Sequence, residues 1–286
     1  MEKLQITKDF GSTMVIVPHQ DDEVLMTAGV LYILAELEVP VTVVMVTNGD
    51  CDCPDHSKGY VRLLETIEGM KVLGIQKEQL RFMGYADTGM DPKDSFLTHL
   101  YEAEDGQKVF ASSCSDKTYS LETMPEFHLE KYNCHAAYTR DMCKSDLRQL
   151  IEEKKPQNIF TTSEYDMHGD HSALCKFVYE IVDDIKMREI YEPSVYCGLV
   201  HSCAGDEHWP SRDSKWFDCP EGIEDQEGLD WSSRIVLELP EEMQTGRGDA
   251  NIKYRALKKY VTALEPNAYE FLMSFIKDEE IFWKVR

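Results

Sequence analysis

Two short segments of this sequence concentrate side chains that could bind a metal ion and activate water. The first is Pro18-His19-Gln20-Asp21-Asp22-Glu23, and the second is Asp166-Met167-His168-Gly169-Asp170-His171. Imidazole nitrogen and carboxylate oxygen are ordinary zinc ligands, and a catalytic zinc typically keeps about three protein ligands and an open position for water. Crowded titratable groups repel one another and are hard to desolvate, and a bound cation would resolve both problems. The two segments therefore predict a shared metal site.

Both segments are expected where a strand ends and a helix begins. The β-like runs Thr13–Val17 and Asn158–Thr162 directly precede them, and helical patterns follow at residues 24–38 and 172–187. In open α/β sheets, ligands bind in the crevice beyond the carboxyl ends of the strands. We therefore expect the two segments to face each other at one edge of a sheet.

The remaining pattern alternates between strand and helix, which predicts an α/β, Rossmann-like fold with a mostly parallel sheet and helices on both faces. No linker or repeat divides the chain, so residues 1–286 are expected to form a single domain. The stretches 87–137 and 204–231 lack periodicity and are expected to be irregular loop insertions near the site. Further strands are expected at residues 41–46, 80–83, 194–200 and 234–239, and further helices at 60–73, 139–155, 250–264 and 267–277.

Composition narrows the class of protein. The formal net charge of −23 argues against binding to nucleic acid or to anionic membranes, since both require basic patches. The N-terminus lacks an apolar signal core, and no apolar run approaches the ~20 residues of a membrane span. These features predict a soluble, cytoplasmic protein. Among nine cysteines, Cys51 and Cys53 form the only close pair; reduced thiols are expected, with a redox or metal role as the alternative.

Together the two segments resemble the paired motifs of the LmbE-like (PIG-L) de-N-acetylases. That family has a Pro-His-Pro-Asp-Asp-Glu turn after its first strand and a His-Pro-Asp-His turn later, and here Gln20 and Gly169 replace the prolines. Members are zinc-dependent hydrolases that remove an acetyl group, usually from N-acetylglucosamine in a larger conjugate. Other stretches that are similar to the family lie at residues 62–65, 73–75, 84–87, 138–140 and 201–210.

The resemblance implies a role for each polar residue of the first segment. Zinc (Zn²⁺) would be held by His19, Asp22 and His171, although another divalent transition metal suits these ligands too. Asp21 would act as general base on the attacking water. A second metal-ligand role or a helix cap is the alternative for Asp21.

The second segment and three more distant residues would complete the site. By resemblance, His168 would stabilise the oxyanion and protonate the leaving amine, with Asp170 fixing its tautomer and raising its pKa. The alternative for His168 is a fourth metal ligand. Arg62, Asp87 and His201 would bind substrate hydroxyls, although Arg62 could instead pair with Glu65 or Asp87, and His201 could be structural.

These expectations add up to a zinc-dependent N-deacetylase, an amide hydrolase that releases acetate and a free amine from an N-acetylglucosaminyl conjugate. One alternative is a hydrolase of another N-acyl or non-sugar amide on the same site. A second is a metal-binding module without catalysis, which would need neither Asp21 nor the pair His168 and Asp170. A nucleotide-binding regulator is disfavoured because the Gly-x-Gly-x-x-Gly fingerprint is absent from the first turn.

Overall fold

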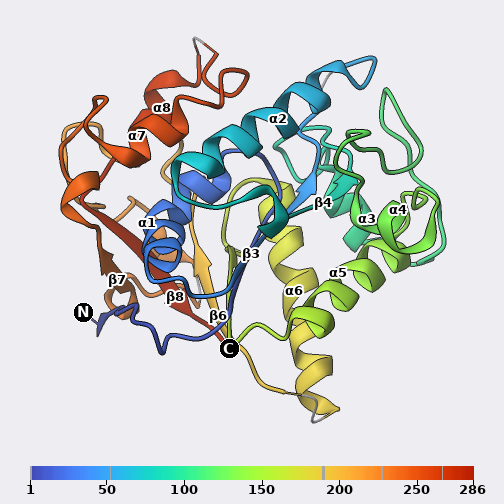
Figure 1. The fold of residues 1–286 in the computed structure, drawn as a ribbon, viewed down its shortest axis with the longest axis horizontal. Helices are drawn as coiled ribbons and strands as arrows, with labels where there is room; N and C mark the ends of the chain where they lie inside the picture. Colours follow the sequence, from blue (N-terminus) through green and yellow to red (C-terminus); the bar gives the residue numbers. More distant parts are fainter. Residues whose placement is uncertain (1, 52, 189–190, 227, 266) are drawn as a thin grey trace.

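A mixed, mostly parallel sheet of eight strands forms the centre of the molecule, as the computed structural model shows (Figure 1). The structure describes residues 2–51, 53–188, 191–226, 228–265 and 267–286. The strand order is β1-β7-β8-β6-β5-β2-β3-β4, and only β8 runs antiparallel to its neighbours. The predicted fold class is confirmed. The strands are β1 (Glu2–Lys3), β2 (Thr13–Val17), β3 (Val41–Thr47), β4 (Leu80–Tyr85), β5 (Asn158–Thr162), β6 (Ser194–Gly198), β7 (Ile235–Glu238) and β8 (Glu279–Lys284).

Helices cover both faces of the sheet and enclose two apolar cores (Figure 1). Successive side chains of a strand point to opposite faces, so Val15 and Val17 of β2 enter one core while Met14 and Ile16 enter the other. One core is covered by α1 (Asp22–Glu36), α2 (Ser57–Val72), α7 (Ile252–Leu257) and α8 (Tyr269–Met273); the other is covered by α3 (Phe96–Tyr101), α4 (Phe127–Tyr132), α5 (Arg140–Lys154) and α6 (Gly169–Met187).

The order of the parallel strands creates a switch point between β2 and β5. From β2 the chain adds β3 and β4 on one side, then crosses back to add β5 and β6 on the other. At such a point the loops beyond neighbouring strands diverge and leave a crevice. Because β2 and β5 pair in parallel, the two polar segments that follow them leave the sheet side by side.

The expected irregular insertions hold little regular structure. Residues 87–137 contain only the short helices α3 and α4 and isolated bridges, and residues 204–231 contain a 3-10 turn at Ile223–Asp225. Other 3-10 turns lie at Lys77–Gln79, Trp231–Ser233 and Glu241–Met243. Among the described helices, none has the length and apolar character needed to cross a lipid bilayer.

The C-terminal region differs most from expectation. The two predicted helices are reduced to α7 and α8, and the chain then forms β8, which the sequence did not predict. Glu279 and Glu280 open this strand, and both are buried. Two adjacent acids ordinarily indicate an exposed segment. Burial of this strand therefore depends on partners that are distant in the sequence and that the local sequence pattern does not reveal.

A buried ion pair supplies the partner of Glu280 and lies at a break in α1, while Glu279 accepts from the Phe217 N–H at 2.9 Å. The helix has non-helical dihedrals at Thr27, which frees nearby backbone groups. Gly29 N donates to Glu280 Oε1 at 2.9 Å, and Lys253 Nζ donates to the carbonyl oxygen of Leu25 at 2.8 Å. Lys253 Nζ also lies 3.1 Å from Glu280 Oε1. The C-terminal region thereby satisfies the polar groups at the bend of the helix that begins with Asp22.

Candidate metal centre

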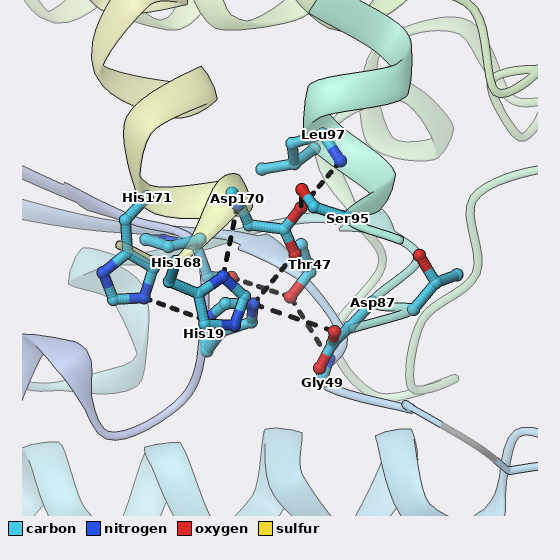
Figure 2. A network of polar contacts seen from close by, with 12 residues as sticks. His19, Thr47, Gly49, Asp87, Ser95, Leu97, His168, Asp170 and His171 are labelled. Carbon is cyan, nitrogen blue, oxygen red and sulfur yellow. Dashed lines mark hydrogen bonds and ion pairs between the residues drawn. The ribbon is translucent and has the colours of Figure 1, made fainter. Parts of the chain in front are cut away.

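The two polar segments meet at three ligand atoms. His19 Nδ1 lies 3.2 Å from His171 Nε2, and Asp22 Oδ2 lies 3.4 Å and 3.3 Å from these two nitrogens. All three residues are buried. Metal–ligand bonds of about 2.0–2.1 Å in a tetrahedron place ligand atoms roughly 3.3 Å apart. The three residues therefore fit a single divalent ion of the size of zinc, and Figure 2 shows the two imidazoles facing each other.

Local backbone geometry explains how the first segment presents these groups. The chain turns sharply between β2 and α1, and Asp21 takes a φ of 119°, which non-glycine residues rarely adopt. Asp21 N donates to Glu23 Oε2 at 2.9 Å, and His19 N donates to Asp22 Oδ2 at 3.0 Å. Glu23 is thus a structural acid that holds the turn. Strained residues of this kind persist where the surrounding contacts fix them, as they often do at functional sites.

The carboxylates around His19 and His171 favour positive charge between them. Burial lowers the pKa of His19, but Asp87, Asp170 and Asp22 outweigh it and hold that pKa well above its ordinary value. Burial likewise lowers the pKa of His171, but its neighbouring carboxylates raise it to about 10. A divalent cation between the imidazoles would supply the same positive charge that these carboxylates favour.

A carboxylate lies behind each of the two imidazoles. His19 Nε2 lies 3.0 Å from Asp170 Oδ2, and His171 Nδ1 lies 3.2 Å from Asp166 Oδ2. Such partners fix which ring nitrogen faces a metal and orient the ring. Sequence reasoning gave Asp166 no role. Its position in the same polar segment, five residues before His171, is the sequence feature that could have indicated this contact.

The expected contact between the Asp170 carboxylate and the His168 ring is not formed. The carboxylate is turned toward His19, and only the backbone N–H of Asp170 reaches His168, donating to Nδ1 at 3.2 Å. Burial and the imidazoles of His19, His171 and His201 lower the pKa of His168, so its ring is neutral rather than an imidazolium. With Nδ1 accepting a hydrogen bond, the proton of this neutral ring lies on Nε2.

Two further groupings surround His19. Ligand atoms of His19, His168 and His171 lie within 4.8 Å of one another, so His168 as a fourth ligand stays a prediction, one that requires the ring to lose its Nε2 proton or its hydrogen bond at Nδ1. Asp87 and Asp170 form a second such group with His19. There His19 uses Nε2, which is 3.9 Å from Asp87 Oδ1 but within hydrogen-bond distance of Asp170. We assign this second group to support of the ring, because its direct contact is a hydrogen bond.

Asp21 and Arg62 lie together at the mouth of the cluster. Burial raises the pKa of Asp21, the Arg62 guanidinium at 3.8 Å opposes the shift, and the result is a pKa of about 6. Arg62 Nη2 also donates to the Gln20 carbonyl oxygen at 2.6 Å. The alternative pairing of Arg62 with Glu65 is not formed, because Glu65 instead accepts from the Thr262 N–H at 3.1 Å. A carboxylate with a pKa near 6 is suited to act as a base at neutral pH.

These residues open into a pocket of about 620 Å³. Seven of the nine predicted site residues line it, while Asp170 and His171 lie behind that wall. His201 Nδ1 lies 3.0 Å from the Asp206 carboxylate, and its ring stacks on Phe271. The outer wall contains Asp206, Glu207 and Arg212 from the loop that was expected near the site, together with seven residues that the sequence pattern did not indicate: Thr262, Ala263, Glu265, Asn267, Ala268, Phe271 and Leu272. In the sequence, this C-terminal part shows only a helical pattern, with no motif that marks a site.

The close cysteine pair lies outside this pocket. Cys51 and Cys53 occupy the connection between β3 and α2, and neither joins a metal-binding group in the part of the chain that the structure describes. The redox alternative for these thiols stays a prediction.

Solved structures with similar folds include several deacetylases. N,N'-diacetylchitobiose deacetylase from Pyrococcus horikoshii has a TM-score of 0.56 at 14% identity, with coverage of 99% of this chain and 87% of that one. The A40926 pseudoaglycone deacetylase has a TM-score of 0.56 at 17% identity, covering 95% and 96%. A teicoplanin deacetylase in its zinc-inhibited form has a TM-score of 0.50 at 18% identity, covering 88% and 85%. These likenesses establish the fold alone.

The sequence itself supplies the family. No curated protein matches the chain. The model of the family described as PIG-L, GlcNAc-PI de-N-acetylase, matches residues 14–182, which include both polar segments and more than half of the chain. This chain is therefore a member of the PIG-L (LmbE-like) deacetylase family.

Proposed function

We propose that this protein is a Zn²⁺-dependent hydrolase that removes the N-acetyl group from an N-acetylglucosaminyl conjugate. The observation that supports it most strongly is the convergence of His19 Nδ1, Asp22 Oδ2 and His171 Nε2 within 3.2–3.4 Å. Asp21 lines the same pocket as His19 and Asp22. A structural zinc site would need neither an adjacent base nor an open pocket, so the arrangement favours catalysis over metal binding alone.

Asp21 and His168 would have separate roles in hydrolysis of the amide. When bound, the divalent metal would polarise the acetyl carbonyl and acidify the attacking water. Asp21 would take the proton of that water. His168, with its proton on Nε2, would donate to the developing oxyanion. The C–N bond then breaks, and the proton held by Asp21 passes to the nitrogen, giving acetate and a free amine.

The pocket supports a polar, extended substrate. Its volume of about 620 Å³ leaves room for a substrate beside the metal cluster, and its lining offers Arg62, Asp87 and His201 as partners for hydroxyl groups. The family description and the chitobiose deacetylase with a similar fold both name N-acetylglucosamine compounds. An N-acetylglucosaminyl conjugate therefore fits these observations better than a simple alkyl amide.

A panel of acylated amines tests the proposal. The protein is incubated with N-acetylglucosamine, N,N'-diacetylchitobiose, longer N-acyl glucosamines and non-sugar acetamides, and the free amine is measured. Release of amine from the N-acetylated sugars is expected. Exclusive turnover of longer acyl chains or non-sugar amides would contradict the sugar assignment, and no turnover by the metal-loaded protein would favour a binding module.

The Asp21→Asn variant tests the mechanism within that panel. Removal of a general base is expected to lower kcat by about 10²–10⁴-fold while one equivalent of zinc stays bound. Zinc should be added in stoichiometric amount, since a deacetylase of similar fold is described in a zinc-inhibited form. Turnover near the parent rate would exclude Asp21 from the mechanism.

A further inference from the structure

The insertion that follows β4 reaches the metal centre through Ser95, the residue before α3. Ser95 Oγ donates to Asp170 Oδ1 at 2.5 Å, and Leu97 N donates to the same oxygen at 2.8 Å. The second oxygen of Asp170 lies 3.0 Å from His19 Nε2. Figure 2 shows this continuous path from α3 to the imidazole. Ser95 and Asp170 are both fully buried, so water does not compete for these contacts.

Gly169 allows the insertion to approach this closely. A Cβ atom at this position would lie 2.5 Å from Ser95 Cβ and 2.8 Å from Pro92 Cα, distances that real Cβ atoms do not show. In addition, Gly169 N donates to the Met90 carbonyl oxygen at 2.8 Å. A proline, as in the similar family motif, would lose this N–H and fill the same space with its ring. The glycine and the serine contact therefore belong to one arrangement.

We propose that Ser95 is a positioning residue for His19, acting through Asp170, and that Gly169 makes its approach possible. His19 must present an unprotonated Nδ1 to a metal, which requires its proton to lie on Nε2. Asp170 accepts that proton in a hydrogen bond, and Ser95 fixes the rotation of the Asp170 carboxylate. This inference rests on the proposed metal site and extends it to a segment that is far from the motifs in sequence.

Metal affinity tests the inference without using catalysis. The zinc dissociation constant of the Ser95→Ala variant is measured by competition with a chelator, and the absorption spectrum of the Co²⁺ form reports the geometry of the ligands. The expected result is a roughly tenfold weaker zinc affinity and a changed Co²⁺ spectrum, since loss of outer-shell partners typically costs about 10–100-fold. Unchanged affinity and spectrum would overturn the proposal.

Ser95 Oγ also caps α3 by accepting from the Thr98 N–H at 3.2 Å, so Thr139→Ala is the matched control for loss of a helix cap. Thr139 is also buried and its Oγ1 accepts from the Met142 N–H at 3.2 Å at the start of α5, whereas the Asp170 carboxylate contacts Ser95, Leu97 and His19. Both variants should lose stability through the missing cap. Only Ser95→Ala should lose zinc affinity; an equal loss in Thr139→Ala would show a general structural effect and overturn the assigned role.

Asp170→Asn keeps the shape of the side chain and serves if Ser95→Ala does not fold. Its amide N–H₂ cannot accept from His19 Nε2, so it favours the ring tautomer with the proton on Nδ1. Zinc affinity should fall by about 10–100-fold, and parent-like affinity would contradict the proposed path. If the parent binds zinc but hydrolyses no N-acetylated sugar, the proposed function fails while the positioning role stands.

Discussion

The inner and outer walls of the pocket come from different parts of the chain and differ in character. The inner wall, with His19, Asp22 and His168, lies within the family-matched residues 14–182, and its side chains are buried and tied to one another. The outer wall comes mainly from residues 200–212 and 262–272, where Glu207 and Glu265 are exposed. Pre-organised chemistry requires fixed groups, whereas exposed side chains can vary at little cost in stability. We therefore expect the inner wall to set the reaction and the outer wall to select the conjugate.

The largest difference between the two walls is expected when a metal ligand is removed. His171→Ala is expected to lose stoichiometric zinc and to lower kcat/KM by at least about 10³-fold, since a catalytic metal contributes several kcal/mol. Phe271→Ala, in the outer wall, should retain zinc. Metal analysis and steady-state kinetics on both variants test this contrast, and zinc loss in Phe271→Ala would abolish the distinction.

The C-terminal region should nevertheless be essential for stability through its link to α1. Lys253→Met leaves the buried Glu280 carboxylate without its cation and is expected to lower the free energy of unfolding by about 3–5 kcal/mol. Urea denaturation measures the effect. Lys3→Met, which removes an exposed pair with Glu238, is the control and should change stability by no more than about 1 kcal/mol. Equal effects would show that the buried pair has no special role.

The pH dependence of turnover should report the ionisation of Asp21 in the inner wall. Asp21 must be ionised to act as a base, so kcat/KM should fall as the pH drops below about 6, the pKa to which burial raises this carboxyl. Arg62 lowers the same pKa, so Arg62→Met should move this acid limb to higher pH. A pH–rate profile for each protein measures the shift, and an unmoved limb would remove Asp21 as the titrating group.

Substitutions in the outer wall should have the smallest effects. Glu207 and Glu265 outnumber Arg212 there, so the wall disfavours anionic conjugates. Glu265→Gln should lower KM for an anionic conjugate by no more than about fivefold, the worth of an exposed charge pair, and leave kcat unchanged. Kinetics with neutral and anionic N-acetylglucosaminyl conjugates measure this difference. A change in kcat alone would show that Glu265 acts on the reaction itself, as expected for a residue of the inner wall.

Much of the framework could be predicted locally. The bounds of β2 and β5 agree with the expected strands, and α5 and α6 lie within a few residues of the expected helices. Buried parallel strands and amphipathic helices are encoded by neighbouring residues, so their periodicity is visible in the sequence. The same holds for the polar segments, because each keeps its ligands within six consecutive positions.

The sequence by itself therefore determined strands β2 to β7, their carboxyl edge and the residue types gathered there. Only the tertiary structure decided that the Asp170 carboxylate contacts His19 rather than His168, that Ser95 contacts Asp170, and that the C-terminal region lines the pocket. These contacts join residues 75 to 151 positions apart. No local periodicity records them, because they form only when packing brings buried polar groups within reach of one another.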